Sequence, residues 1–143
     1  MIAPQGTLIV HASCVAVLGK GVLILGPSGA GKSSLALQLM ALGADLVADD
    51  RTEISVQNGA AIARSPDNIR GLIEARGVGI LQTATLPEAR LSLAVDLGQP
   101  EPDRLPPRRD VLIAGVRIAL VLGPVSGHFC AAVWCYLTGR RHE

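Results

Sequence analysis

The stretch Gly21–Asp50, "GVLILGPSGAGKSSLALQLMALGADLVADD", predicts the centre of the fold. "GVLILG" is a continuous apolar run, typical of a strand in the middle of a sheet. Apolar residues then recur at helical spacing through "KSSLALQLMALG", and Gly43 is placed where a helix would end. "ADLVADD" reads as a second short strand that ends in acidic residues. A strand, a glycine-rich turn, a helix and an acidic strand end together predict an α/β fold.

The turn matches the phosphate-binding pattern G-x-x-x-x-G-K-[ST], known as the P-loop, and has a strand before it and a helix after it, as the motif requires. Glycines let successive backbone N–H groups point at phosphate oxygens, and the positive end of the helix adds to this attraction. The lysine can reach the β- and γ-phosphates, and the last serine can bind Mg²⁺. We therefore expect a nucleotide or another polyphosphate to bind the residues Gly26, Pro27, Ser28, Gly29, Ala30, Gly31, Lys32 and Ser33.

Three residues outside the loop are candidates for the chemistry. Asp49 and Asp50 end the second strand, where one carboxylate could sit on the metal side and the other could accept a proton. The alternative is an acidic turn in solvent. His11 lies in the apolar segment "IVHAS", and a lone histidine there is more often a core residue than a catalytic one.

The segment "GLIEARGVGI" carries Glu74 and Arg76 among the glycines Gly71, Gly77 and Gly79. The glycines indicate backbone that approaches another group closely. At spacing i, i+2, a carboxylate and a guanidinium on one strand would share a face, suited to holding a metal and a phosphate side by side. The alternative is a surface ion pair, which contributes little.

The composition excludes several classes of protein. The chain has 143 residues, a length suited to one domain, and a formal net charge of +1, which does not call for nucleic acid or a membrane surface as a partner. Its 49% hydrophobic and 17% charged residues leave a surface poor in charge, as in an oligomer. No apolar run reaches the roughly 20 residues of a membrane span, and no signal peptide is evident. Cys14, Cys130 and Cys135 lack metal spacing and favour small buried apolar residues in the cytoplasm.

The remaining segments predict mostly β-structure. "GTLIVHASCVAVLG" reads as a strand pair with its turn at residues 19–21, and "TEISVQNGAAIARSP" as a hairpin with its turn at Asn58-Gly59. "NIRGLIEARGVGIL" reads as mixed loop and strand, and "LGQPEPDRLPPRRD" as loop. "VLIAGVRIALVLG" predicts one or two strands, and "GHFCAAVWCYLTGRRHE" a short final helix with Arg140 and Arg141 near its end.

The combination "HASCVAV…GVLILGPSGAGKSSLAL…GADLVADD…GLIEARGVGI" resembles the C-terminal catalytic domain of HPr kinase/phosphorylase, over roughly residues 8–81. It looks most like the short form typical of alphaproteobacteria, which lacks the N-terminal domain. The resemblance implies a single P-loop domain over residues 1–143, with the mixed β-sheet and few helices that this family shares with phosphoenolpyruvate carboxykinase. It also implies a homo-oligomer, by family a hexamer, in the cytoplasm.

Residue roles also follow from the resemblance. The loop would bind ATP or inorganic phosphate or pyrophosphate, with Lys32 on the phosphates. The metal ligands would be Ser33, Asp49 and Glu74, holding Mg²⁺. The catalytic residues would be His11, Lys32, Asp49, Asp50 and Arg76, with Asp50 as the base for the substrate serine. That serine belongs to the phosphocarrier HPr or to its paralogue in the nitrogen system, so the activity would regulate the phosphotransferase system.

Two positions depart from the family pattern. Ser34 follows the Lys-Ser pair where the family has an acidic residue, and a late loop reads Pro124-Val125-Ser126-Gly127-His128-Phe129 where "P-V-x-P-G-R-N" is expected. His128 stands at or next to the position where the family has an arginine. A histidine is not always charged near neutral pH, whereas an arginine is. Other arginines that could substitute are Arg108, Arg109 and Arg117.

Three hypotheses stay open at this point. The first is a Mg²⁺- and ATP-dependent serine kinase, with or without phosphorylase activity, acting on HPr or a paralogue. The second is a P-loop phosphotransferase acting on a small molecule. The third is a nucleotide-binding regulatory protein with degraded catalysis, which the departures at Ser34 and His128 favour.

Overall fold

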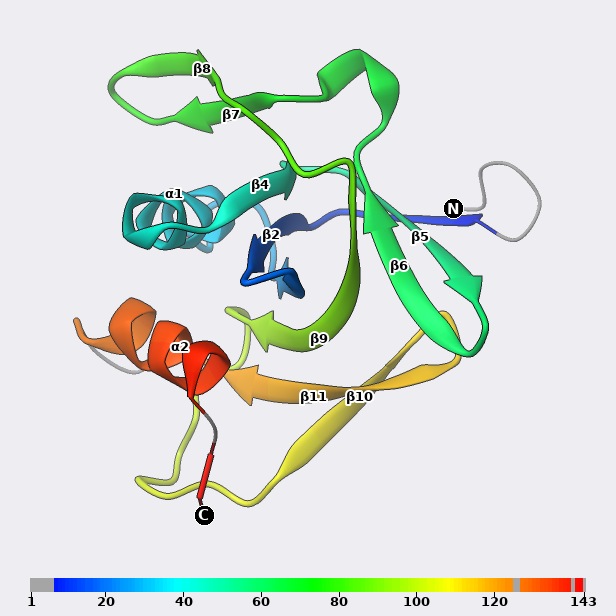
Figure 1. Ribbon diagram of the computed structural model, residues 1–143. Coiled ribbons are helices and arrows are strands. Elements are labelled where there is room, and N and C mark those ends of the chain that lie inside the picture. Colours follow the sequence, from blue (N-terminus) through cyan, green and yellow to red (C-terminus); the bar gives the residue numbers. More distant parts are fainter. Residues whose placement is uncertain (1–6, 125–126, 140, 143) are drawn as a thin grey trace.

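The computed structural model describes residues 7–124, 127–139 and 141–142. Within this part of the chain, nine strands form one mixed sheet, in which β3 pairs with β9 and β9 with β11 in parallel, and the other pairs are antiparallel (Figure 1). The strands are β1 (Thr7–Val10), β2 (Ser13–Val17), β3 (Lys20–Leu25), β4 (Asp45–Ala48), β5 (Thr52–Gln57), β6 (Ala60–Arg64), β9 (Glu88–Asp96), β10 (Arg109–Ile113) and β11 (Val116–Leu122).

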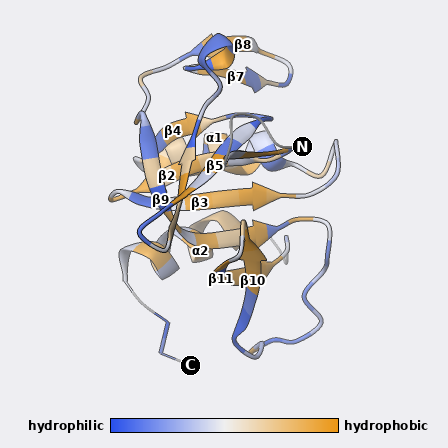
Figure 2. Ribbon diagram, turned by 90° about the vertical axis from the view of Figure 1, so that its right-hand side faces the viewer, coloured by the Kyte–Doolittle hydropathy of each residue, from blue (hydrophilic) through white to orange (hydrophobic). Residues whose placement is uncertain are grey.

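Strand β3 lies near the middle of the sheet, between β2 and β9, as its apolar sequence predicts. Figure 2 shows it as an apolar strand through the centre of the molecule. The parallel strands β3, β9 and β11 end at the same edge, and the P-loop leaves the sheet there. The fold therefore places the loop where open α/β sheets bind their ligands.

The helices α1 (Lys32–Leu42) and α2 (Phe129–Thr138) cover one face of the sheet. Because side chains alternate along a strand, Val15 and Val17 of β2 pack toward these helices, whereas Cys14 and Ala16 pack into a second cluster on the other face. Strands β5, β6, β10 and β11 contribute residues to that second cluster. The sheet is curved, so these strands cover the face of β2 and β3 that the helices leave open.

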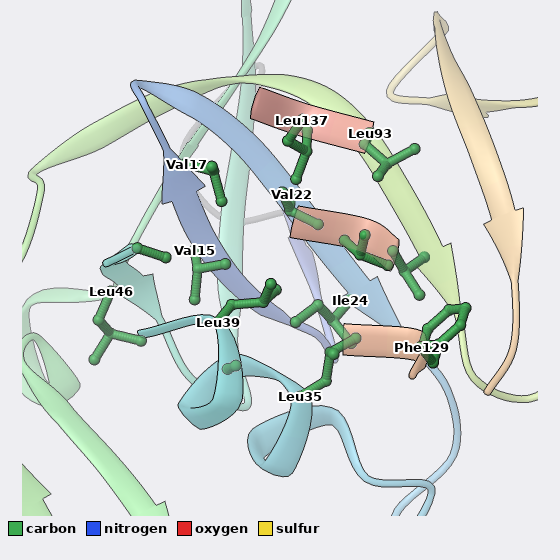
Figure 3. Close-up of a cluster of buried hydrophobic side chains, with 14 of the residues drawn as sticks. Val15, Val17, Val22, Ile24, Leu35, Leu39, Leu46, Leu93, Phe129 and Leu137 are labelled. Carbon is green, nitrogen blue, oxygen red and sulfur yellow. The ribbon is translucent and has the colours of Figure 1, made fainter. Parts of the chain in front are cut away.

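Leu39 anchors α1 to the sheet, and we predict that Leu39→Ala lowers the free energy of unfolding by about 2–5 kcal/mol. Its side chain is fully buried in the cluster that contains Val15 and Ile24 (Figure 3). The matched control is Leu42→Ala, because Leu42 lies in the same helix and is 49% exposed. Urea unfolding of both variants tests the prediction, and equal losses in the two would contradict it.

Several sequence predictions are confirmed. The predicted helix forms over Lys32–Leu42 and ends at Gly43, whose φ of 125° favours glycine. The hairpin β5–β6 turns at Asn58-Gly59, both with positive φ, as a tight hairpin turn requires. The late apolar segment forms the hairpin β10–β11, the Pro-rich stretch before it is loop, and the final segment forms α2.

Other predictions are wrong or incomplete. The first turn lies at Leu18-Gly19, because Lys20 and Gly21 already belong to β3, and β1 pairs with β5 and not with β2. Strand β9 was not predicted, although it is the longest strand described. The prediction that the cysteines are buried holds for Cys14, where burial raises the pKa of the thiol to about 12. It does not hold for Cys135, which is exposed.

The glycine-containing segment forms a separate two-stranded hairpin, β7 (Leu72–Ala75) and β8 (Gly79–Gln82), after the short 3-10 turn η1 (Asp67–Ile69). The hairpin stands beyond α1 and β4 in Figure 1, at the side of the molecule away from α2. Ile73 anchors it in the helix-side core. None of the described helices is both long enough and apolar enough to cross a membrane.

Candidate active site

The P-loop connects β3 to α1 through a turn that needs its glycines. Gly26 has a φ of 148°, and Gly31 caps α1 with a φ of 100°, both outside the range that other residues adopt easily. The Nζ of Lys32 donates hydrogen bonds to the carbonyl oxygens of Gly26 (2.8 Å) and Pro27 (3.1 Å). The Lys32 side chain therefore folds back against the loop, and its ammonium group places a positive charge beneath the phosphate cradle.

A second turn supports the loop from behind. Gly98 lies so close that a Cβ at this position would be 3.1 Å from Cδ of Pro27. The carboxylate of Asp96, at the end of β9, accepts hydrogen bonds from the Gly98 N–H (2.8 Å) and from Nε2 of Gln99 (2.7 Å). The turn that follows the unpredicted strand β9 therefore packs against the P-loop and supports it.

Asp49 lies at the end of β4 and is buried beneath the cradle. Its Oδ1 accepts hydrogen bonds from the hydroxyl groups of Ser13 and Ser33, each at 2.7 Å. Its Oδ2 accepts one from the backbone N–H of Glu74 at 3.2 Å. This carboxylate joins β2, the P-loop helix and the β7–β8 hairpin, so it ties the parts of the site together.

Asp50 points in a different direction from Asp49. Its φ of 68° is in the left-handed region, which a non-glycine residue adopts only where the surroundings hold it. Two backbone hydrogen bonds do so: Arg51 N–H donates to the Asp49 carbonyl (2.7 Å), and Ala12 N–H to the Asp50 carbonyl (3.1 Å). Nε2 of His11 lies 2.8 Å from Oδ1 of Asp50, and the ring donates when the carboxylate is ionised.

A cavity of about 310 Å³ lies between the P-loop and Asp50. Polar atoms dominate its walls, as suits a phosphate site. The residues that line it come from the β1–β2 connection, β2, the P-loop, α1, the end of β4 and the β7–β8 hairpin: His11, Ser13, Ser28, Gly29, Gly31, Lys32, Ser33, Ser34, Asp50, Glu74 and Arg76.

The structure thus brings together most residues predicted for the site. Asp49 lies under the cavity, and Gly26, Pro27 and Ala30 shape the loop without lining it. Glu74 and Arg76 both line it, but Arg76 belongs to the turn after β7, so the two do not share a strand face as predicted.

Ser13 is a site residue that sequence reasoning missed. Besides its bond to Asp49, its hydroxyl accepts a hydrogen bond from the backbone N–H of Asp50 at 3.4 Å. One hydroxyl therefore connects the two aspartates. The available signal was its position as the polar residue that begins an otherwise apolar buried strand.

The oxygen donors fit a magnesium ion at a nucleotide site. Ser33 supplies a hydroxyl adjacent to the Asp49 carboxylate, and Glu74 lines the same cavity. Mg²⁺ at such sites takes one or two carboxylates and completes its shell with phosphate and water oxygens. Within the described residues, no three His, Cys, Asp or Glu side chains group closely enough to hold an ion by themselves.

Comparison with known proteins decides the family. The family model "HPr Serine kinase C-terminal domain" matches residues 3–119, which is most of the chain. The chain belongs to this family. The match extends well beyond the residues 8–81 on which the sequence resemblance rests, and it includes β9, β10 and part of β11.

Curated relatives named HPr kinase/phosphorylase agree with this assignment. The protein from Aromatoleum aromaticum is 41% identical over 130 residues, covering 81% of this chain and 42% of that protein. The one from Thermoanaerobacter sp. is 47% identical over 100 residues, covering 67% of this chain and 32% of that protein. The chain therefore spans less than half the length of these relatives.

A solved structure shares the fold. The "Hpr(Ser) kinase/phosphatase from Coxiella burnetii" superposes with a TM-score of 0.78 at 25% identity, covering 92% of this chain and 93% of that one. The predicted fold class, a mixed sheet with few helices of the HPr kinase type, is confirmed.

The departures from the family pattern lie in different parts of the fold. Ser34 lines the phosphate cavity. His128 is the residue at the N-cap position of α2 and does not line that cavity, and Val125 and Ser126 lie outside the described residues.

The arginines considered as substitutes for the late-loop arginine do not reach the phosphate site. Arg109 pairs with Glu101, and Arg117 with Asp110. Together with Arg108 they line a hollow beside Tyr136 of α2, away from the P-loop. The suggestion that they replace the expected arginine is therefore wrong for this arrangement.

Proposed function

We propose that this chain is an ATP- and Mg²⁺-dependent serine kinase that phosphorylates the phosphocarrier HPr or a paralogue, and so regulates the phosphotransferase system. The observation that carries the proposal is the carboxylate of Asp50, held at the edge of the same cavity as the P-loop. Family membership supports the choice of HPr.

The chain's own residues divide the work of phosphoryl transfer. Loop N–H groups and Lys32 bind the phosphates of ATP and neutralise their charge. Asp50 accepts the proton of the serine hydroxyl while the serine oxygen attacks the γ-phosphorus of ATP. The bond between the γ-phosphorus and the oxygen that bridges to the β-phosphate breaks, and ADP is released. His11 orients Asp50 through the 2.8 Å contact. Arg76 lines the cavity and places a further positive charge there.

Ser33, Asp49 and Glu74 are the residues that would hold Mg²⁺, and the ion would supply further charge neutralisation at the phosphates. Asp49 then serves the metal side and Asp50 the proton, which is the division of roles that their different hydrogen-bond partners support.

Further parts of the proposal concern the whole protein. We place the catalytic domain at residues 1–143, in the cytoplasm, without nucleic acid or membrane as partners. A homo-oligomer is supported by the exposed side chains of Leu18, Leu105 and Leu112, each more than 60% exposed.

The test is transfer of label from [γ-³²P]ATP to purified HPr. We expect phosphoserine to form on HPr only with Mg²⁺, and no label to be incorporated when EDTA is present from the start. Adding inorganic phosphate to the labelled HPr tests whether pyrophosphate forms in the reverse reaction. Label in a metabolite of a cell extract, and none in HPr or its paralogue, would overturn the proposal in favour of a small-molecule phosphotransferase.

A further inference from the structure

Ser13 carries a buried hydroxyl group whose two hydrogen-bond partners are the two aspartates of the site. The residue begins β2, which lies in the sheet between β3 and β4, and its side chain is fully buried. A polar group that leaves water without a partner costs free energy, so a buried hydroxyl is kept where its hydrogen bonds are made. Oγ of Ser13 donates to Oδ1 of Asp49 at 2.7 Å and accepts from the backbone N–H of Asp50 at 3.4 Å.

On the metal side of the site, Ser13 holds the carboxylate of Asp49. That carboxylate has two other donors, the hydroxyl of Ser33 at 2.7 Å and the backbone N–H of Glu74 at 3.2 Å. Both of these residues are assigned to magnesium, whereas Ser13 belongs to the sheet and is not. A partner outside the ligand shell orients a metal ligand and keeps it in place when the ion binds. Ser13 therefore has the position of such a partner for Asp49.

On the proton side, Ser13 holds the main chain that carries Asp50. The N–H of Asp50 donates to the Ser13 hydroxyl, and the carbonyl of Asp50 accepts from the N–H of Ala12 at 3.1 Å. Two successive residues before and at the start of β2 thus bind both polar groups of this main chain. Its left-handed φ of 68° persists only where such contacts hold it. They therefore set the direction in which the carboxylate leaves the chain toward His11.

From these contacts we propose that Ser13 is a positioning residue for phosphoryl transfer, whose hydroxyl fixes the metal-side carboxylate relative to the proton-side carboxylate. The inference rests on the proposed kinase function and adds a residue to its machinery. A hydroxyl that donates becomes a better acceptor, so the bonds to Asp49 and Asp50 strengthen each other. Phosphoryl transfer depends on alignment and charge neutralisation more than on covalent chemistry, so a loss of this link is expected to slow the reaction.

The first test compares Ser13→Ala with the matched control Ser65→Ala. Ser65 is also buried, but its hydroxyl donates to the carbonyl of Pro66 at 2.9 Å and does not line the phosphate cavity. We expect Ser13→Ala to lower kcat with HPr about 10- to 100-fold, and to weaken Mg²⁺ binding to the complex with a non-hydrolysable ATP analogue by a similar factor. The KM for HPr should change by no more than about two-fold, because the buried hydroxyl is not exposed to a protein acceptor. Ser65→Ala should leave all three values unchanged.

Ser13→Thr separates the hydroxyl group from the packing at this position. Threonine keeps the hydroxyl and is favoured in strands, so we expect this variant to restore both kcat and the affinity for Mg²⁺. If Ser13→Thr melted at the wild-type temperature but had the low kcat of Ser13→Ala, the hydroxyl would not be the cause. A normal kcat or a normal Mg²⁺ affinity in folded Ser13→Ala would also overturn the proposal.

Hydrogen exchange of the Asp50 amide, followed by NMR of ¹⁵N-labelled protein without ATP or HPr, separates failure of this proposal from failure of the kinase assignment. We expect this amide to exchange about 2- to 10-fold faster in Ser13→Ala, as for the loss of one hydrogen bond, and at the wild-type rate in Ser65→Ala. If the wild type does not phosphorylate HPr, but Ser13→Ala exchanges faster and binds Mg²⁺ more weakly, the kinase assignment fails and the positioning role stands. If the wild type phosphorylates HPr and the exchange rate is unchanged in Ser13→Ala, the positioning role is wrong and the kinase assignment stands.

Discussion

Asp50→Asn is expected to lower the rate of phosphoryl transfer to HPr by about 10² to 10⁴, the usual contribution of a general base. Asparagine keeps the shape of the side chain and tolerates the left-handed φ of 68°. Its carbonyl oxygen can still accept the hydrogen bond from His11. What it loses is the ability to take the serine proton, so the binding of Mg²⁺·ATP and the melting temperature should stay close to those of the wild type.

Asp45→Asn is the matched control, because Asp45 is an exposed carboxylate at the opposite end of β4. Steady-state rates with HPr, isothermal titration with a non-hydrolysable ATP analogue and thermal melts should be measured for both variants. A near-normal transfer rate in Asp50→Asn would exclude Asp50 as the base and would leave His11 as the group to test next.

The sequence predicts the part of the fold in which local signals and chemistry coincide. The P-loop, its helix and the strand that precedes Asp49 and Asp50 are one continuous segment, so the glycines, the helical spacing and the apolar runs support each other. His11 joins the site because β2 pairs with both β3 and β4, which brings the residues just before β2 beside the end of β4. Only the family resemblance gave this residue a catalytic role in advance.

Long-range pairing explains what the sequence did not predict. Strand β9 shows alternation from Glu88 to Leu93, yet its position between β3 and β6 depends on residues distant in sequence. Its role behind the P-loop, through Asp96 and Gly98, is visible only once β3 and β9 lie in parallel. The cavity of about 400 Å³ that Ile69, Ile73 and Ile80 line likewise forms from η1, β7, β8 and the end of β4, so it cannot be predicted from any single stretch of the sequence.

Lys32→Met is expected to lower kcat/KM for ATP by about 10² to 10³, as for the loss of a single hydrogen-bond donor to developing charge at an active site. Methionine has nearly the same length but no charge and no donor. The phosphates lose their positive partner, and the carbonyl groups of Gly26 and Pro27 lose the ammonium group that joins them. The affinity for ATP should therefore fall as well, which a titration with the non-hydrolysable analogue measures.

Lys20→Met separates this effect from the general loss of a lysine. Lys20 lies at the other end of β3, where its Nζ donates to the carbonyl oxygen of Leu137 at the C-terminal end of α2 (3.0 Å). A cation there stabilises the helix by about 0.3–1 kcal/mol, so Lys20→Met should lower the melting temperature by a few degrees and leave kcat/KM for ATP unchanged. If Lys32→Met lost stability to the same extent as Lys20→Met while it still transferred phosphate normally, Lys32 would be a structural residue of the loop, and the cradle would bind phosphate through its main-chain N–H groups alone.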